Sequence, residues 1–164
     1  MNFNLTEISR NLIQDAIKAN IASALQDVRS DRGDALVSTE PPAKYYIYVP
    51  ERLYQLPAIV TFVTDIDFMK ERFNANHINA TIHMQVYVIV EDRILDNLII
   101  KSERYMSALY GIIDQKEFIS SDNQVKIYSI VHRASFSDEY KEGDIFRKQV
   151  LIDLNIRHFE KLFT

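Results

Sequence analysis

The chain has 164 residues, and its 47% hydrophobic and 26% charged content is that of an ordinary globular protein. Its 19 Lys and Arg stand against 23 Asp and Glu, and the formal net charge of −4 excludes the basic field with which tight DNA binders neutralise phosphates. Cys is absent, which excludes disulfides, thiolate nucleophiles and thiolate metal sites. We expect one domain over residues 1–164 with a sizeable core.

The beginning of the sequence predicts neither export nor a membrane anchor. The first residues, MNFNLTEISR, lack the apolar run of a signal peptide, and no stretch of about 18 apolar residues follows anywhere. We therefore expect a protein that is made and kept in a cytoplasm and has no membrane partner.

The first predicted element is an amphipathic helix from Leu5 to about Val28. Its apolar residues recur at intervals of three and four, which is the spacing of one helical face. Residues 29–42 then mix charges with a Gly and a Pro pair, so we predict a flexible polar connector there.

Five later segments have the character of strands. The clearest is Thr81 to Val90, in which every second residue is apolar, from Ile82 to Val90. The others are rich in β-branched and aromatic residues and cover 44–49, 58–63, 125–131 and 146–157. Between the third and fourth strands, Asp92 precedes an apolar stripe that predicts a second helix, which ends near Asp114.

This order of elements predicts the fold class. Two amphipathic helices each need an apolar surface to cover, and one face of a sheet supplies it. We therefore predict an α+β fold with a mainly antiparallel or mixed sheet of about five strands and both helices on one face.

No constellation of residues in the sequence predicts catalysis or a cofactor. The chain has no Gly-x-Ser-x-Gly turn, and only three Gly are available for phosphate-binding loops. The nearest approach to a metal site combines Asp65 and Asp67 with His77 and His83, but its spacing is not that of a known ligand set, and solvated charges explain it more simply. We expect no catalytic residue, no metal and no cofactor.

The stretch from Thr64 to Ala80 is long for a connection between two strands, which usually takes two to five residues. Its large apolar residues include Phe68, Met69, Phe73 and Ile78. Exposed apolar clusters of this kind commonly mark an interface, so we predict an interface loop over 64–80. In the alternative interpretation, the segment folds back as a short helix over its own sheet.

The arrangement of elements resembles that of the tail terminator or tail-completion proteins of tailed bacteriophages. The resemblance covers nearly the whole chain in element order and is carried by a Tyr-rich strand, the YQLPAIV segment, an acidic turn that opens a helix, and a terminal strand. These segments are Tyr45–Tyr48, Leu56–Val60, Val86–Asp92 and Val150–Ile156. The stretches 64–80 and 29–42 depart from the family pattern.

The resemblance implies a structural virion protein that is not an enzyme. Such proteins form rings, commonly hexameric, that cap the tail tube, end its polymerisation and meet the neck of the head. The implied partners are further copies of this chain, the tail tube protein and a neck or connector protein. DNA would pass through the ring without sequence-specific binding, and the protein would be assembled in the host cytoplasm and kept in the virion.

The segment SFSDEYKEGD has two interpretations under this resemblance. Its acidic residues, Asp138, Glu139, Glu142 and Asp144, would line the DNA channel, where negative charge prevents adhesion to phosphates. Alternatively, the segment is simply the solvated tip of a hairpin.

Two other functions stay open at the level of sequence. One is a neck or head-to-tail joining protein, which would bind the portal side instead of the tube. The other is a small ligand-binding domain or an enzyme, for which the sequence offers no convergent set of polar groups.

Overall fold

The structure is a computed structural model that describes residues 5–32, 39–48, 55–68, 77–122 and 125–161. Two helices, α1 (Leu5–Arg32) and α2 (Leu95–Ile113), accompany one sheet. The strands of this sheet are β1 (Lys44–Tyr46), β2 (Ala58–Phe68), β3 (His77–Asp92), β4 (Lys116–Ile119), β5 (Val125–Phe136), β6 (Tyr140–Glu142) and β7 (Ile145–Lys161).

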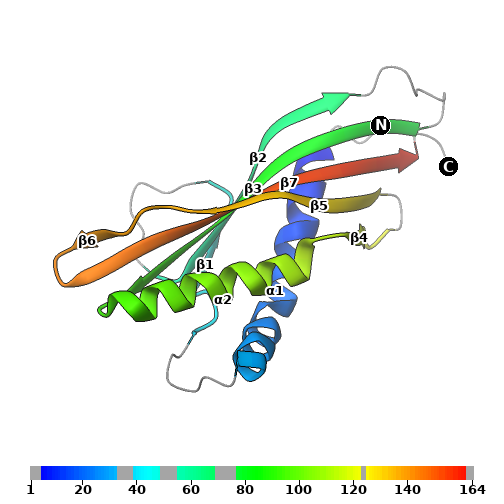
Figure 1. The fold of residues 1–164 in the computed structure, drawn as a ribbon. Coiled ribbons are helices and arrows are strands. Elements are labelled where there is room, and N and C mark those ends of the chain that lie inside the picture. Colours follow the sequence, from blue (N-terminus) through cyan, green and yellow to red (C-terminus); the bar gives the residue numbers. More distant parts are fainter. Residues whose placement is uncertain (1–4, 33–38, 49–54, 69–76, 123–124, 162–164) are drawn as a thin grey trace.

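The sheet is mixed and larger than the five strands that the sequence predicts. Its seven strands follow the order β1-β2-β3-β7-β5-β4, and β6 pairs with one end of β7. The pair β1 and β2 is parallel, whereas every other described pair is antiparallel. Both helices pack on one face, so the predicted α+β class and the helical layer are confirmed. Figure 1 shows α1 crossing the sheet while α2 runs beside β5.

Several element boundaries differ from the sequence-based prediction. The helix α1 continues to Arg32, so the first four residues of the predicted connector at 29–42 are helical. The predicted loop over 64–80 is wrong at both ends, because β2 runs on to Phe68 and β3 already begins at His77. Two short strands, β4 and β6, were not predicted, since four or three residues show too little alternation to be recognised.

The core lies between the helices and one face of β3 and β7. The alternate residues Ile82, Met84, Val86, Val88 and Val90 of β3 are at most 1% exposed, as the period of two predicts. Opposite them on β7, the same burial holds for Val150, Ile152, Leu154 and Ile156. Each fully buried side chain of this size contributes about 1.5–3 kcal/mol relative to an exposed one.

Hydrogen bonds fix both ends of α2 to the sheet. At its beginning, Asp92 accepts a bond from the backbone N–H of Ile94 at 2.9 Å and pairs with Lys101 at 2.5 Å. At its end, Asp114 Oδ1 accepts from the backbone N–H of Val131 at 2.9 Å, and Ser129 Oγ donates to the carbonyl of Ile113. The predicted acid at residue 92 therefore caps the turn before α2, whereas Ile94 holds the N-cap position itself.

One histidine, His158 of β7, lies inside the core. It pairs with Ala80 of β3 and Ile127 of β5, is 1% exposed, and has no hydrogen-bond partner for either ring nitrogen among the described residues. Burial disfavours the charged imidazolium and lowers the pKa of His158 to about 4.

This burial predicts a loss of stability in acid. Because the unfolded chain binds the His158 proton near pH 6.5 and the folded chain only near pH 4, the free energy of unfolding is highest above pH 6.5 and falls between these values. The loss reaches up to about 3 kcal/mol at 1.4 kcal/mol per pKa unit. Urea denaturation of the wild-type protein at pH 7.5 and pH 4.5 measures it.

The His158→Leu variant should lose most of this pH dependence, because it has no proton to bind in the unfolded state. The exposed His132 supplies the matched control, and His132→Leu should leave the difference between the two pH values unchanged. Equal pH dependence in the wild type and His158→Leu would contradict the assignment.

Candidate assembly surfaces

The first candidate surface is the end of the β2–β3 pair. Figure 1 shows that β2, β3 and β7 continue past both helices at this end of the sheet. There Phe68 is 51% exposed and pairs with Ala80 across the ladder. The short-helix alternative is wrong for 64–68 and 77–80, which are strands. Of the other predicted interface residues, Ile78 pairs with Glu160 in the sheet, while Met69 and Phe73 lie outside the described residues.

The second candidate surface is the acidic hairpin, and it lies at the opposite end of β7. The chain turns tightly between β6 and β7 through Gly143, whose φ of 62° favours a residue without a side chain. Two of the four predicted acids form ion pairs, since Glu139 contacts Lys148 and Glu142 contacts Arg147. The other two, Asp138 and Asp144, are exposed. The uncompensated negative charge of the hairpin is therefore smaller than its sequence suggests.

The basic partners of these acids also reach the sheet. Arg147 contacts Glu91 of β3 at 3.3 Å, so one guanidinium joins β3, β6 and β7. The ammonium of Lys148 lies over the ring of Phe136 at 5.9 Å from its centroid. Although both side chains are partly screened by water, such a network positions the hairpin relative to the sheet.

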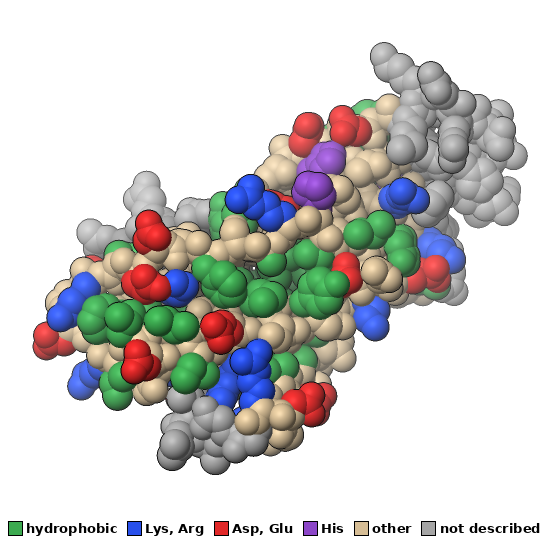
Figure 2. Space-filling view, viewed as in Figure 1, with side chains coloured by type: hydrophobic (Ala, Val, Ile, Leu, Met, Phe, Trp, Pro, Cys, Tyr) green, Lys and Arg blue, Asp and Glu red, His purple; other side chains and the backbone are tan. Residues whose placement is uncertain are grey.

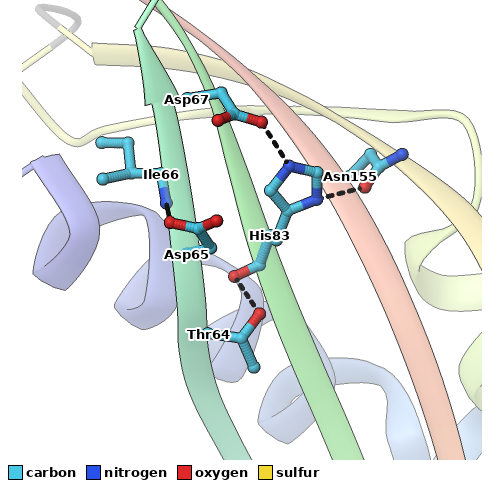
Figure 3. Close-up of polar contacts among 6 residues, drawn as sticks. All are labelled: Thr64, Asp65, Ile66, Asp67, His83 and Asn155. Carbon is cyan, nitrogen blue, oxygen red and sulfur yellow. Dashed lines mark hydrogen bonds and ion pairs between the residues drawn. The ribbon is translucent and has the colours of Figure 1, made fainter.

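A polar cluster occupies the sheet face away from the helices. As Figure 3 shows, the His83 ring lies between Asp67 of β2 and Asn155 of β7. Its Nε2 is 3.0 Å from Asp67 Oδ2, and its Nδ1 is 2.8 Å from Asn155 Oδ1. The hydrogen bond with Asp67 is the main reason why the pKa of His83 is raised, and Asn155 adds to it.

This cluster does not have the form of a metal site. Each ring nitrogen of His83 already contacts an oxygen of Asp67 or Asn155, so neither is directed at a further set of ligands. Across the described parts of the chain, no group of three His, Asp or Glu side chains converges as metal ligands do. Figure 2 shows histidine side chains beside one another with acidic side chains next to them, and His83 and His132 border the same open hollow of about 370 Å³. The arrangement suits an exposed hydrogen-bonding surface.

Large apolar side chains remain exposed along the margins of the sheet. They include Ile47 and Tyr48 after β1, Phe68 on β2, Ile119 on β4 and Phe136 on β5, at 41–62% exposure. Figure 2 shows hydrophobic side chains in a band along the middle of the visible face, with charged ones around it. Ile119 and Phe136 could not be recognised as exposed residues from the sequence, because only the pairing of the strands shows that they stand at an edge.

Comparisons with known proteins find distant similarity among solved structures. No family model and no curated protein matches the chain. Among solved structures, a chain of "Virion of native gene transfer agent (GTA) particle" is similar, with 14% identity, a TM-score of 0.41, and coverage of 88% of this chain and 97% of that chain. This degree of similarity carries no argument about function. In the described residues, no helix is long and apolar enough to cross a membrane.

The exposure of Phe68 predicts the result of replacing it. The Phe68→Ser variant should keep its free energy of unfolding within about 1 kcal/mol of the wild type, because half of the ring is already in water. If the β2–β3 end is an interface, the same variant should assemble less well. Chemical denaturation and light scattering measure the two effects separately.

A buried residue of β3 supplies the control. Met84 is 1% exposed, so Met84→Ala should lose about 2–5 kcal/mol of stability. A Phe68→Ser variant as unstable as Met84→Ala would show that Phe68 serves the monomer core.

Proposed function

We propose that this chain is a structural component of a tailed, phage-like virion, in which it forms a ring that caps the tail tube. The observation that carries the proposal is the row of exposed apolar side chains along the margins of a sheet whose helices cover only one face. A monomer gains nothing from exposing Phe68, Ile119 and Phe136 to water, whereas a subunit of an assembly buries such residues between chains.

The proposed ring is commonly hexameric in the family that the sequence resembles. It ends the polymerisation of the tube on one side and meets a neck or connector protein on the other. Its work is binding, so neither a cofactor nor a catalytic residue is part of the proposal. Assembly takes place in the host cytoplasm, and the finished ring belongs to the virion.

The two candidate surfaces suit different partners because they lie at opposite ends of the long strands. Sixteen residues of β3 separate the two ends, which is roughly 50 Å at 3.3 Å per residue. We propose that the apolar β2–β3 end contacts a neighbouring subunit or the tube. The acidic hairpin then faces the channel, where DNA passes without sequence-specific contacts.

Electron microscopy tests the ring. Negative-stain images of the purified protein, alone and mixed with tail tubes of the parent particle, should show rings with an open centre on the ends of tubes. Tubes polymerised in its presence should also be shorter than tubes without it. If rings form but bind only the portal side, the chain is a neck or head-to-tail joining protein. Monomers that decorate neither partner would contradict both functions.

The acidic hairpin is tested through DNA release. The Asp138→Lys and Asp144→Lys variants put positive charge on exposed positions that take no part in the Glu139 and Glu142 ion pairs. Because Lys side chains attract phosphates, particles with both changes should release DNA more slowly, and the delay should shrink at high salt. The matched charge control combines Asp15→Lys and Asp27→Lys, two exposed positions on α1. Release at the wild-type rate would place the hairpin away from the channel.

A further inference from the structure

The two lateral edges of the sheet are incomplete in complementary places. On one edge, β1 covers β2 only at Ala58–Val60, so among the described residues Thr61–Phe68 of β2 has no neighbouring strand on the side away from β3. On the other edge, β4 covers β5 only at Lys126–Ser129. Among the described residues, Ile130–Phe136 of β5 has no neighbouring strand on the side away from β7. Unpaired edges of this length are templates for association.

The register of the sheet shows how the two edges relate to each other. When paired residues are followed from β2 through β3 and β7 to β5, Val60 is level with Ser135 and Phe68 is level with Ile127. Ile127 in turn pairs with Phe118 of β4. The short strand β4 is therefore level with the part of β2 that β1 leaves unpaired. In the same way, β1 is level with the part of β5 that β4 leaves unpaired.

We propose that a second copy of this chain docks along these edges, with the β2 side of one copy against the β5 side of the next. On each edge the short strand, β1 or β4, ends partway along the longer strand beside it and so forms a step. The two steps then fit into each other while the strands of both copies keep the same register. The same contact repeats at the free edge of each added copy, which makes it heterologous and able to close into a ring. This inference rests on the proposed ring and names the surfaces that build it.

Apolar side chains would meet at both steps of this contact. Phe68 of one copy comes level with Phe118 and the exposed Ile119 on β4 of the next. At the other step, Phe136 comes level with β1, which the exposed Ile47 and Tyr48 follow. Five of the nine large apolar side chains that are exposed in the described residues stand at these two steps, so the edges carry a major share of the exposed apolar surface.

Opposite charges would meet between the steps. The β2 edge exposes the carboxylates of Asp65 and Asp67, whereas the β5 edge exposes the guanidinium of Arg133. Asp65 is level with Ile130, two ladder steps or about 7 Å from Arg133, which is within the reach of a long side chain. Complementary charges of this kind select the partner and its register.

The middle of each edge is also protected against continuous backbone pairing with an edge strand of another chain. Asp65 Oδ1 accepts the backbone N–H of Ile66 at 2.8 Å, and Asp114 Oδ1 accepts that of Val131 at 2.9 Å. Each edge strand also has a bulge beside these bonds, between Val63 and Asp65 and between Val131 and Arg133. Bulges and charged residues are the usual means by which edges avoid uncontrolled pairing. In the central stretch, side chains instead of a backbone ladder would therefore make the contact.

A charge exchange tests the pairing of these two edges. The Asp65→Lys and Arg133→Glu variants should each raise the protein concentration at which half of the chains are assembled by about tenfold or more, because like charges then face each other. The double variant restores opposite charges and should assemble close to the wild-type concentration. Asp15→Lys, an exposed change on α1 with the same charge difference as Asp65→Lys, should have no effect. Sedimentation velocity over a concentration series measures assembly, and circular dichroism verifies that each variant is folded.

The possible results separate this inference from the function on which it rests. If both single variants assemble into rings at the wild-type protein concentration, the edge contact is overturned while the proposed ring remains. Loss of assembly in both single variants without recovery in the double variant would also overturn the pairing. If the wild-type protein forms no ring in solution or on tube ends, the proposed ring fails, and the edge contact fails with it.

Discussion

The antiparallel pairing of β3 with β7 is the interaction on which the rest of the structure depends. It runs without a register shift from His77 opposite Lys161 to Asp92 opposite Phe146. One face of this pair supplies the apolar surface that α1 and α2 cover, and its two margins carry β2 and β5. Because side chains alternate across a strand, a slip by one residue would turn every core residue of β3 toward water.

Coverage of only one sheet face determines where binding surfaces are available. The helices bury the face that contains Val86 and Ile152, and the opposite face carries polar groups such as His83 and Asn155. Antiparallel sheets tolerate this asymmetry, since one face can be solvated while the other is packed. The apolar residues that remain exposed lie largely along the margins, where a neighbouring chain can cover them without disturbing the core.

His83 and His158 belong to the same sheet, but their pKa values shift in opposite directions because they lie on opposite faces. His83 faces outward between Asp67 and Asn155, and its pKa is raised because a carboxylate stabilises the imidazolium. His158 faces inward, and burial lowers its pKa because the core disfavours a charge. The alternation of the strands separates them, since His83 is out of phase with the buried residues of β3, whereas His158 continues the buried series of β7, one residue beyond the strand predicted at 146–157.

The sequence by itself determined the helices, the alternation of the long strands and the α+β class, because these depend on local periodicity. The apolar series of β3 and β7 and the stripe of α2 were all predictable on this basis. Only the tertiary structure decided that Thr64–Phe68 continues β2, that Glu139 and Glu142 are paired, and that Ile119 and Phe136 stand on an edge. Each of these depends on contacts between segments far apart in the chain, and the order of strands in a sheet leaves no periodic signal in the sequence of any one of them.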